Sequence, residues 1–254
     1  MERPKVMGIL NVTPDSFFAG SRVQTEQAIA LRTNQIVAEG AAFIDVGAYS
    51  TRPGASEVSV QEECERLRLA LSVVRREQPD AIVSVDTFRA DVAKMAIEEY
   101  GADIINDVSE GADPDMFRMV SRAHVPYVLM SVRSNLRDML MSFSEKIQLL
   151  RDMGQADILI DPGFGFGKTL EDNWRLMQEM EKLQVLGLPL LVGISRKSMI
   201  FKTLGCTPAE ALNGTTVLNT IALTKGAGIL RVHDVREAVE CCRLVGTMEN
   251  ANKQ

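Results

Sequence analysis

A carboxylate ends an apolar run in the segment 158–169, and a glycine-rich turn follows it at once. The apolar residues 158–160 fit a buried strand, and Pro162 ends that strand abruptly. We therefore expect Asp161 at the carboxyl end of a strand, facing a cleft. The glycines of the turn allow the backbone to pass close to a ligand, and its two phenylalanines offer flat apolar walls.

Two other interpretations of this segment are open. Gly167-Lys168-Thr169 matches the end of a phosphate loop of the form G-x-x-x-x-G-K-[ST], but the first glycine of that motif would fall on Pro162. The segment could also be an ordinary strand-to-helix turn with a solvated aspartate. The rest of the chain has to decide between these interpretations.

A second group of candidate residues lies near the end of the chain. Arg231 and His233 are two positions apart, so on a strand their side chains leave on one face, and two adjacent donors suit a phosphate group. Ser198 precedes the short apolar pattern Met199–Leu204 and can cap that helix, which would direct free N–H groups at an anion. Taken alone, Arg231 could equally form a surface ion pair, and His233 could be a satisfied strand-end histidine.

Short β-branched runs alternate with longer helical patterns along the chain. We expect strands at 5–12, 42–47, 81–87, 103–109, 126–131, 158–163, 190–195 and 229–234. Helical patterns include Thr25–Ala38, Val60–Arg76, Ala90–Tyr100 and Leu170–Leu183, and Thr207–Glu210 has the form of a capping box that starts a helix. Without a linker or composition shift, these units predict an α/β fold: a (β/α)8 TIM barrel formed by a single domain, residues 1–254. A doubly wound open sheet is the alternative.

Nearly every expected strand ends in a polar residue, namely Asn11, Asp45, Asp86, Thr87, Asn106, Asp107, Ser131, Asp161, Ser195, Arg231 and His233. In barrels of this type the active site lies at the carboxyl face, built from strand ends and the loops after them. Two turn-rich loops, Asn11–Ser21 and Tyr49–Ala55, are candidate lids over that face.

Composition limits the classes of protein that remain. The 254 residues are 46% hydrophobic, enough for a large core, and the net charge of −6 argues against general nucleic-acid binding. The chain contains no apolar stretch long enough to cross a bilayer and no signal-peptide pattern at its N-terminus, so we expect no membrane partner. The four cysteines show no C-x-x-C pair, and we interpret them as reduced fillers in helices of a cytoplasmic protein.

Taken together, the motifs resemble the dihydropteroate synthase family, pterin-binding (β/α)8 enzymes of folate biosynthesis. Seven stretches carry the resemblance, in the family's order: Gly8–Phe17, Asp45–Gly54, Ser84–Thr87, Ile105–Val108, Ile160–Lys168, Gly193–Ser198 and Arg231–Asp234. The resemblance covers about residues 7 to 240. It implies condensation of 6-hydroxymethyl-7,8-dihydropterin pyrophosphate with 4-aminobenzoate, which gives 7,8-dihydropteroate and pyrophosphate.

The resemblance also implies roles for individual residues. The pterin is expected between Asp86, Asn106, Asp161 and Lys197, of which Asp86, Asp161 and Lys197 would be catalytic. The pyrophosphate is expected at Asn11, Thr51, Arg52, Arg231 and His233, with Asn11 as the ligand of a Mg²⁺ cofactor. The 4-aminobenzoate is expected at Thr51, Arg52, Pro53, Phe166 and Ser198.

The implied chemistry is alkyl transfer. The CH₂–O bond from pterin to pyrophosphate breaks, and the aminobenzoate nitrogen attacks that carbon. Acceptors around the pterin and cations around the leaving group would stabilise the charges that develop. The resemblance further implies a sulfonamide target and a homodimer joined through late helices, where apolar residues crowd the segment Thr207–Thr224.

One stretch departs from the family's pattern. After the fifth expected strand the family reads close to L-M-H-M-x-G, whereas this chain has Leu129-Met130-Ser131-Val132-Arg133-Ser134. A milder change is Gly-Ala-Tyr in place of Gly-Gly-Glu in the second loop. This departure leaves a non-catalytic pterin-binding paralogue as an alternative to an active synthase. A second alternative, a pterin-dependent methyltransferase acting with a corrinoid protein, rests only on a similar barrel, because that family lacks the combined S-T-R-P-G, S-R-K-S and R-V-H features.

Overall fold

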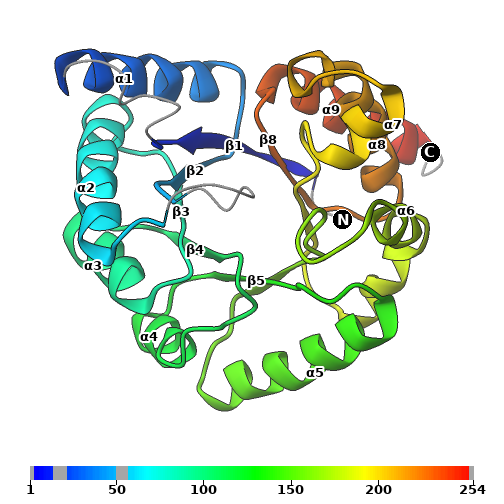
Figure 1. Cartoon of the computed structure of the whole chain (residues 1–254), viewed down its shortest axis with the longest axis horizontal. Coiled ribbons are helices and arrows are strands. Elements are labelled where there is room, and N and C mark those ends of the chain that lie inside the picture. Colours follow the sequence, from blue (N-terminus) through cyan, green and yellow to red (C-terminus); the bar gives the residue numbers. More distant parts are fainter. Residues whose placement is uncertain (1–2, 14–21, 50–56, 252–254) are drawn as a thin grey trace.

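The computed structural model describes residues 3–13, 22–49 and 57–251, and within them eight parallel strands form a barrel surrounded by helices (Figure 1). The strands pair in the order β6-β5-β4-β3-β2-β1-β8-β7, and a parallel bridge between Ile160 and Leu190 joins the two ends of this series. Neighbours in sequence are thus neighbours in the ring, which excludes the doubly wound open sheet and confirms the predicted TIM barrel.

The strands match the predicted positions and are each somewhat shorter. Their bounds are β1 Lys5–Asn11, β2 Phe43–Gly47, β3 Val83–Asp86, β4 Ile104–Asp107, β5 Tyr127–Met130, β6 Ile158–Asp161, β7 Leu191–Val192 and β8 Ile229–Val232. The largest difference is at β7, which is two residues long where the sequence predicted six. The chain leaves the ladder there because a turn at residues 195–196 follows directly.

The helices lie outside the strands, as the ring of coiled ribbons in Figure 1 shows. Their bounds are α1 Arg22–Ala38, α2 Val60–Glu77, α3 Ala90–Tyr100, α4 Met116–Ala123, α5 Leu136–Asp152, α6 Leu170–Glu179, α7 Ser198–Leu204, α8 Leu212–Thr224 and α9 Val235–Ala251. Two 3₁₀ helices, η1 Met180–Leu186 and η2 Pro208–Glu210, complete the described elements.

Helix α2 illustrates how the sequence specifies these elements. The side chain of Ser59 accepts a hydrogen bond from the N–H of Glu62, and acidic residues in the first turn and arginines in the last turn complement the helix dipole. Leu67, Leu71 and Val74 recur at helical spacing and are fully buried. The helix thus packs its apolar stripe against the sheet.

Inside the barrel, an apolar layer lies below a polar one. Met7, Ile104, Val128, Leu191 and Ile229 form a buried cluster, with Phe43 and Leu159 packed against it. Because strand side chains alternate between faces, the residue two positions further along points into the same interior. Those residues include Asp45, Asn106, Asp161 and Arg231, so the strands themselves bring polar groups to the carboxyl end.

Two helix predictions need correction. The pattern Leu170–Leu183 is not one α-helix, because α6 ends at Glu179 and the chain continues as the 3₁₀ helix η1. Met180 and Leu183 are both buried, and a spacing of three fits either helix type. The capping box at Thr207 forms as predicted, but it starts only the short η2, and α8 begins at Leu212.

All four cysteines are free, and Cys206 lies in a loop and not, as predicted, in a helix. Among the described residues, none of the helices combines the length and the apolar character needed to cross a membrane.

Candidate active site

Polar side chains from several strands meet in the upper layer of the barrel. Asp45 of β2, Asn106 of β4 and Asp161 of β6 are buried there, with Asp86 of β3 and Arg231 of β8 partly buried beside them. Each comes from the carboxyl end of its strand. The structure therefore brings together four residues that the resemblance selected, and it adds Asp45.

Arg231 holds two carboxylates of this layer. Its Nε donates to Asp45 Oδ2 at 2.5 Å and its Nη2 donates to Asp86 Oδ2 at 2.6 Å. Burial raises the pKa of Asp86 to about 7, although the charge of Arg231 opposes that shift. Burial also acts to lower the pKa of Arg231, but the attraction of Asp45 and Asp86 outweighs it and the pKa is raised. Arg231 is thus permanently charged, whereas Asp86 can change its charge near neutral pH.

Two side-chain oxygen atoms of the same layer have no hydrogen-bond donor among the described residues. Asn106 Nδ2 donates to Asp45 Oδ2 at 3.2 Å, but within the described part of the chain Asp45 Oδ1 and Asn106 Oδ1 are buried without a hydrogen-bond partner. Leaving a buried acceptor unpaired costs about 1–3 kcal/mol. Two such atoms side by side indicate a site for a ligand that carries N–H or O–H donors.

Asp161 and Lys197 form the other side of the layer. The N–H of Gly163 donates to Asp161 Oδ1 at 2.7 Å. Lys197 Nζ donates to the carbonyl of Phe164 and lies 4.5 Å from the centroid of the Phe166 ring. Burial raises the pKa of Asp161, opposed first by Lys197, and burial lowers the pKa of Lys197 to about 8, opposed first by Asp161. The carboxylate of Asp161, the ammonium of Lys197 and the Phe166 ring thus lie on one side of the layer.

The glycine-rich turn fits tightly against the end of β5. Gly163 has a φ of +69°, and a Cβ there would collide with the carbonyl oxygen of Ser131. Lys168 Nζ donates to the carbonyls of Ser131, Gly163 and Phe166, each at 3.0 Å. Lys168 is therefore engaged by its own turn, which excludes the phosphate-loop interpretation. Asp161 is only 7% exposed, so the solvated aspartate is also excluded.

The loops after β7 and β8 are tied to each other. His233 Nδ1 lies 3.0 Å from Ser195 Oγ, and the N–H of His233 donates to the same oxygen at 3.2 Å. Arg196 binds Asp234 through two hydrogen bonds of 2.6 and 2.9 Å. Arg231 and His233 are therefore held by different partners, Arg231 by carboxylates in the interior and His233 by a hydroxyl of the neighbouring loop.

Ser198 does not cap α7, so that prediction is wrong. The N-cap is Lys197, which has extended backbone angles and makes no side-chain capping bond, and Ser198 is the first helical residue. The reason is the turn before it, in which the N–H of Lys197 donates to the carbonyl of Ile194 and leaves Lys197 as the last extended residue. Ser198 still lies at the amino end of α7, next to Lys197.

The predicted anion and metal ligands are only partly described. Asn11 is the last residue of β1, and its Oδ1 lies near Gly47, next to Asp86. Thr51, Arg52 and Pro53 lie outside the described residues, as do most of the two predicted lid loops. Within residues 3–13, 22–49 and 57–251, no group of three or more His, Cys, Asp and Glu side chains is arranged to hold a metal ion.

Sequence reasoning assigned no role to two residues of this region. Asp45 was named only as a polar strand end, although its spacing of two from Phe43 places it on the inward face of β2, where it accepts from Arg231 and Asn106. Lys168 was treated only as part of a phosphate-loop motif, yet it binds three carbonyls and its pKa is lowered by burial to about 8.

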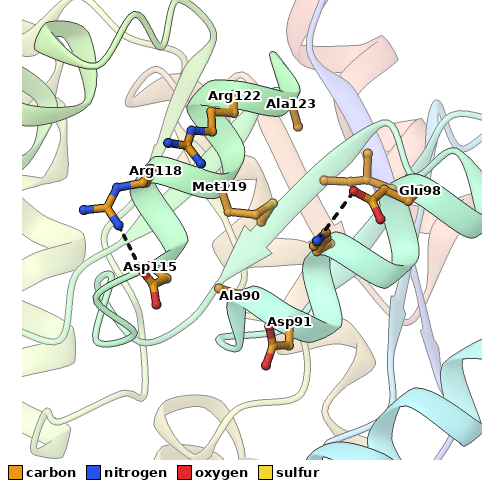
Figure 2. Close-up of a pocket in the computed structure, with 10 residues that line it drawn as sticks. Ala90, Asp91, Glu98, Asp115, Arg118, Met119, Arg122 and Ala123 are labelled. Atoms are coloured by element: carbon orange, nitrogen blue, oxygen red, sulfur yellow. Dashed lines mark hydrogen bonds and ion pairs between the residues drawn. The ribbon is translucent and has the colours of Figure 1, made fainter.

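A separate cavity of about 440 Å³ lies on the outer side of the molecule between α3 and α4 (Figure 2). Both signs of charge line it, and two ion pairs, Arg118–Asp115 and Lys94–Glu98, neutralise part of that charge. It contains no predicted site residue, so it does not compete with the strand ends as a candidate active site.

Comparison with known proteins is consistent with this geometry. The family described as pterin binding enzyme matches residues 7–233 of this chain. A dihydropteroate synthase of Escherichia coli K12 is 38% identical over 260 residues, which cover 96% of this chain and 92% of that protein. The structure of FolP (dihydropteroate synthase) from Clostridium difficile in the presence of pteroic acid has a TM-score of 0.92 at 34% identity and covers 97% of each chain. The Xanthomonas albilineans dihydropteroate synthase with 4-aminobenzoic acid has a TM-score of 0.90 at 34% identity, covering 98% of this chain and 94% of that one.

Proposed function

This chain belongs to the dihydropteroate synthase family of pterin-binding enzymes, and on that premise we propose that it is an active transferase of folate biosynthesis. It joins 6-hydroxymethyl-7,8-dihydropterin pyrophosphate to 4-aminobenzoate and releases 7,8-dihydropteroate and pyrophosphate. The observation that carries this proposal is the pair of buried acceptors without partners, Asp45 Oδ1 and Asn106 Oδ1, in the polar layer of the barrel. A pterin ring has several N–H donors, which these oxygens can accept.

In this proposal the pterin occupies the space between Asp86, Asn106, Asp161 and Lys197. Both carboxylates are largely withdrawn from water, so a hydrogen bond from the pterin to either would be charge-assisted and strong. Lys197 lies over the Phe166 ring and near Asp161, and in this position its ammonium would hold one edge of the pterin. Asp86, Asp161 and Lys197 are the proposed catalytic residues, because they contact the ring whose charge changes as the CH₂–O bond breaks.

The leaving pyrophosphate is proposed to meet cationic groups at the end of β8 and in the loop after it. Arg231 is always charged, and His233 stands in the adjacent loop with Ser195 as its partner. Bond cleavage places positive charge on the pterin and negative charge on the leaving group. In this proposal the carboxylates stabilise the charge on the pterin and the cationic groups stabilise the charge on the leaving group, which is electrostatic stabilisation by preorganised groups. Thr51 and Arg52 remain predicted members of this group.

The residues present suit a Mg²⁺ ion that is bound largely by the substrate. Mg²⁺ keeps several waters and takes one or two protein oxygens together with phosphate oxygens. Asn11 offers an amide oxygen at the end of β1, next to Asp86, and would be the protein ligand. When bound, the ion would neutralise charge on the pyrophosphate.

The second substrate is proposed to lie against Phe166 and the amino end of α7. The Phe166 ring provides an apolar surface, and Ser198 at the first helical position presents a backbone N–H to the carboxylate of 4-aminobenzoate. Thr51, Arg52 and Pro53 are predicted to complete this site. Because sulfonamides copy 4-aminobenzoate, we also predict that they bind here and compete with it.

We further propose that the protein is a cytoplasmic homodimer. Leu204, Val217, Leu244 and Met248 are between 49% and 73% exposed on the helices α7, α8 and α9, which pack consecutively. Exposed apolar side chains on neighbouring helices suit a protein interface. The free cysteines are consistent with a reducing compartment. Small-molecule substrates are the only other partners we propose; we expect neither nucleic acid nor membrane.

A pyrophosphate-release assay tests the proposed activity. Purified protein with the dihydropterin pyrophosphate and Mg²⁺ should release pyrophosphate rapidly only when 4-aminobenzoate is added, and 7,8-dihydropteroate should form in equal amount. A protein that binds 6-hydroxymethyl-7,8-dihydropterin but releases no pyrophosphate would instead be the non-catalytic paralogue. Asp161→Asn protein serves as the control for contaminating synthase.

A further inference from the structure

A buried carboxylate that the proposed reaction does not use lies behind the pterin layer. Glu110, in the loop after β4, is 3% exposed and has a φ of +65°, a backbone angle that favours glycine. Its Oε1 accepts hydrogen bonds from Ser142 Oγ at 2.9 Å and from Ser131 Oγ at 3.2 Å. Its Oε2 lies 3.3 Å from Arg133 Nε and 3.9 Å from Lys146 Nζ. Glu110 thus combines an unfavourable backbone angle with a buried side chain that has four polar partners. Such strained residues cluster at functional sites, although Glu110 is not one of the proposed catalytic residues.

Ser131 connects this carboxylate to the substrate site. The N–H of Ser131 donates to the carbonyl of Asp161 at 2.8 Å, and its own carbonyl accepts from Lys168 Nζ at 3.0 Å. Lys168 also binds the carbonyls of Gly163 and Phe166. One residue, fully buried, thus joins Glu110 to both the strand end and the turn from which Asp161 and Phe166 project.

We propose that Glu110 is a positioning residue that fixes the pterin-binding turn 161–168 through Ser131. Two of its four side-chain partners, Ser131 and Arg133, fall in the stretch where the sequence departs from the family's pattern. In this proposal the changed residues still support the turn 161–168. The contact between Ser131 and Glu110 does so at the position where the family has a histidine. This inference rests on the proposed function, because it assigns Glu110 a task in binding the pterin.

The physical argument concerns backbone position. The Ser131 hydroxyl also accepts from the N–H of Arg133 at 3.1 Å, so it orders the first residues after β5. Without Glu110 the hydroxyls of Ser131 and Ser142 lose their common acceptor, and the segment at 131–133 can shift. Asp161 is bonded to that segment and would shift with it, and displacements of about 1 Å are enough to lose catalytic geometry.

Three variants separate positioning from simple stability. Glu110→Gly removes the carboxylate at a position whose φ suits glycine, so the backbone itself is not strained further. Glu110→Gln keeps an Oε1 acceptor for both serines. Of the two cations at Oε2, Arg133 is half-exposed and can turn to solvent, and Lys146 keeps its hydrogen bond to the backbone carbonyl of residue 110. Glu98→Gln is the control, since it makes the same change of carboxylate to amide in the exposed Lys94–Glu98 pair on the outer helix α3 (Figure 2).

The measurement is the affinity for 6-hydroxymethyl-7,8-dihydropterin, which lacks the leaving group, together with kcat/KM for its pyrophosphate and the Tm. Glu110→Gly should weaken pterin binding and lower kcat/KM by about tenfold each. Glu110→Gln should recover binding to within about threefold of the wild type, and Glu98→Gln should leave it within about twofold. If Glu110→Gly does not fold, Ser142→Ala removes one of the two hydrogen bonds more gently and should weaken binding in the same direction.

Two results overturn the inference: unchanged pterin affinity in the folded Glu110→Gly or Ser142→Ala protein, or a Glu110→Gln protein as weak as Glu110→Gly. The proposed function fails separately, when wild-type protein binds the pterin but does not turn over its pyrophosphate, and the affinities of the variants still decide the role of Glu110. Wild-type protein that binds no pterin overturns both.

Discussion

Arg231 Nη2 donates to Asp86 Oδ2 at 2.6 Å across the barrel, between two strands, β8 and β3, that are not neighbours in the ring. The proposed ligand of the pyrophosphate is therefore paired with a proposed ligand of the pterin. Arg231 also binds Asp45, so the three side chains form one charged unit in the interior. A substrate that carries a pterin and a pyrophosphate would have to insert between Arg231 and the two carboxylates. Its pyrophosphate would replace the carboxylates as the partner of Arg231, and its pterin N–H groups would replace Arg231 as donors to the carboxylates.

Replacing Arg231 should destabilise the protein in a pH-dependent manner. Arg231→Met leaves Asp45 and Asp86 buried without their cation, and breaking a buried pair costs about 3–5 kcal/mol. Burial raises the pKa of Asp86, and without Arg231 the main opposition to that shift is lost, so Asp86 binds a proton more readily in the folded variant than in the unfolded chain. The folded variant then binds more protons than the unfolded one, so its stability falls as pH rises.

Urea denaturation at acidic and at alkaline pH measures this difference, and Arg68→Met is the matched control. Arg68 also donates two hydrogen bonds to a carboxylate, Glu99, but both side chains are 44% exposed, so its loss should have little effect on stability at either pH. Equal losses in the two variants, or a loss for Arg231→Met that does not change with pH, would contradict the prediction.

Asp161→Asn should weaken pterin binding while the fold is retained. The amide still fills the space, but it accepts hydrogen bonds less well than a carboxylate and removes the charge next to Lys197. Losing one charged hydrogen bond costs about 1.5–3 kcal/mol. Calorimetric titration with the dihydropterin checks this, with Asp157→Asn, an exposed aspartate just before the same strand, as control. Unchanged affinity would place Asp161 outside the pterin site.

Gly163→Ala should be more damaging than Gly101→Ala, although both glycines have positive φ. The backbone cost is similar, about 1–2 kcal/mol, because φ is +69° at Gly163 and +61° at Gly101. A Cβ at Gly101 has nothing within 4 Å, whereas one at Gly163 collides with the Ser131 carbonyl. We expect a further ~1–3 kcal/mol at Gly163 from that collision. The difference in Tm between Gly163→Ala and Gly101→Ala therefore measures the cost of the collision. Equal Tm values for the two variants would contradict the prediction, because they would mean that the turn shifts without cost.

The barrel and much of its polar layer could be predicted because both follow from local rules. Strand period places Asp45, Asn106 and Asp161 inward, and parallel strands bring their carboxyl ends to one side. The roles of Asp86, Lys197 and Asn11 came from the resemblance alone and stay predictions, since composition and spacing do not assign a substrate to a strand end.

The errors arose where a local pattern depends on distant contacts. Whether Ser198 or Lys197 is the N-cap is decided by the turn at Arg196, and that turn is held by Asp234, which lies 38 residues later in the chain. The contact between Ser131 and Glu110 could not be predicted either, because Glu110 is 21 residues away in a loop without a recognisable pattern. Side-chain pairs of this kind leave no periodic signal in a single sequence.

The pH dependence of turnover follows from two groups that face the pterin. The pKa of Asp86 is raised by burial to about 7, so the carboxylate that should accept the pterin's hydrogens is formed only as pH rises through that value. The pKa of Lys197 is lowered by burial to about 8, so its charge is lost above that value. We expect kcat/KM for the dihydropterin pyrophosphate to follow a bell, with its maximum between these two values.

Variants assign the two limbs of that bell. Asp86→Asn cannot titrate, so its kcat/KM should be low and should lose the acidic limb while keeping the alkaline one. Lys197→Arg stays charged, so the alkaline limb should move upward by at least about one unit. Glu98→Gln, which removes an exposed carboxylate of the α3–α4 surface, should reproduce the wild-type curve and so controls for the general effect of changing a carboxylate to an amide. An acidic limb that survives in Asp86→Asn would assign it to the substrate or to Asp161, and the proposed role of Asp86 as the titrating acceptor would have to be withdrawn.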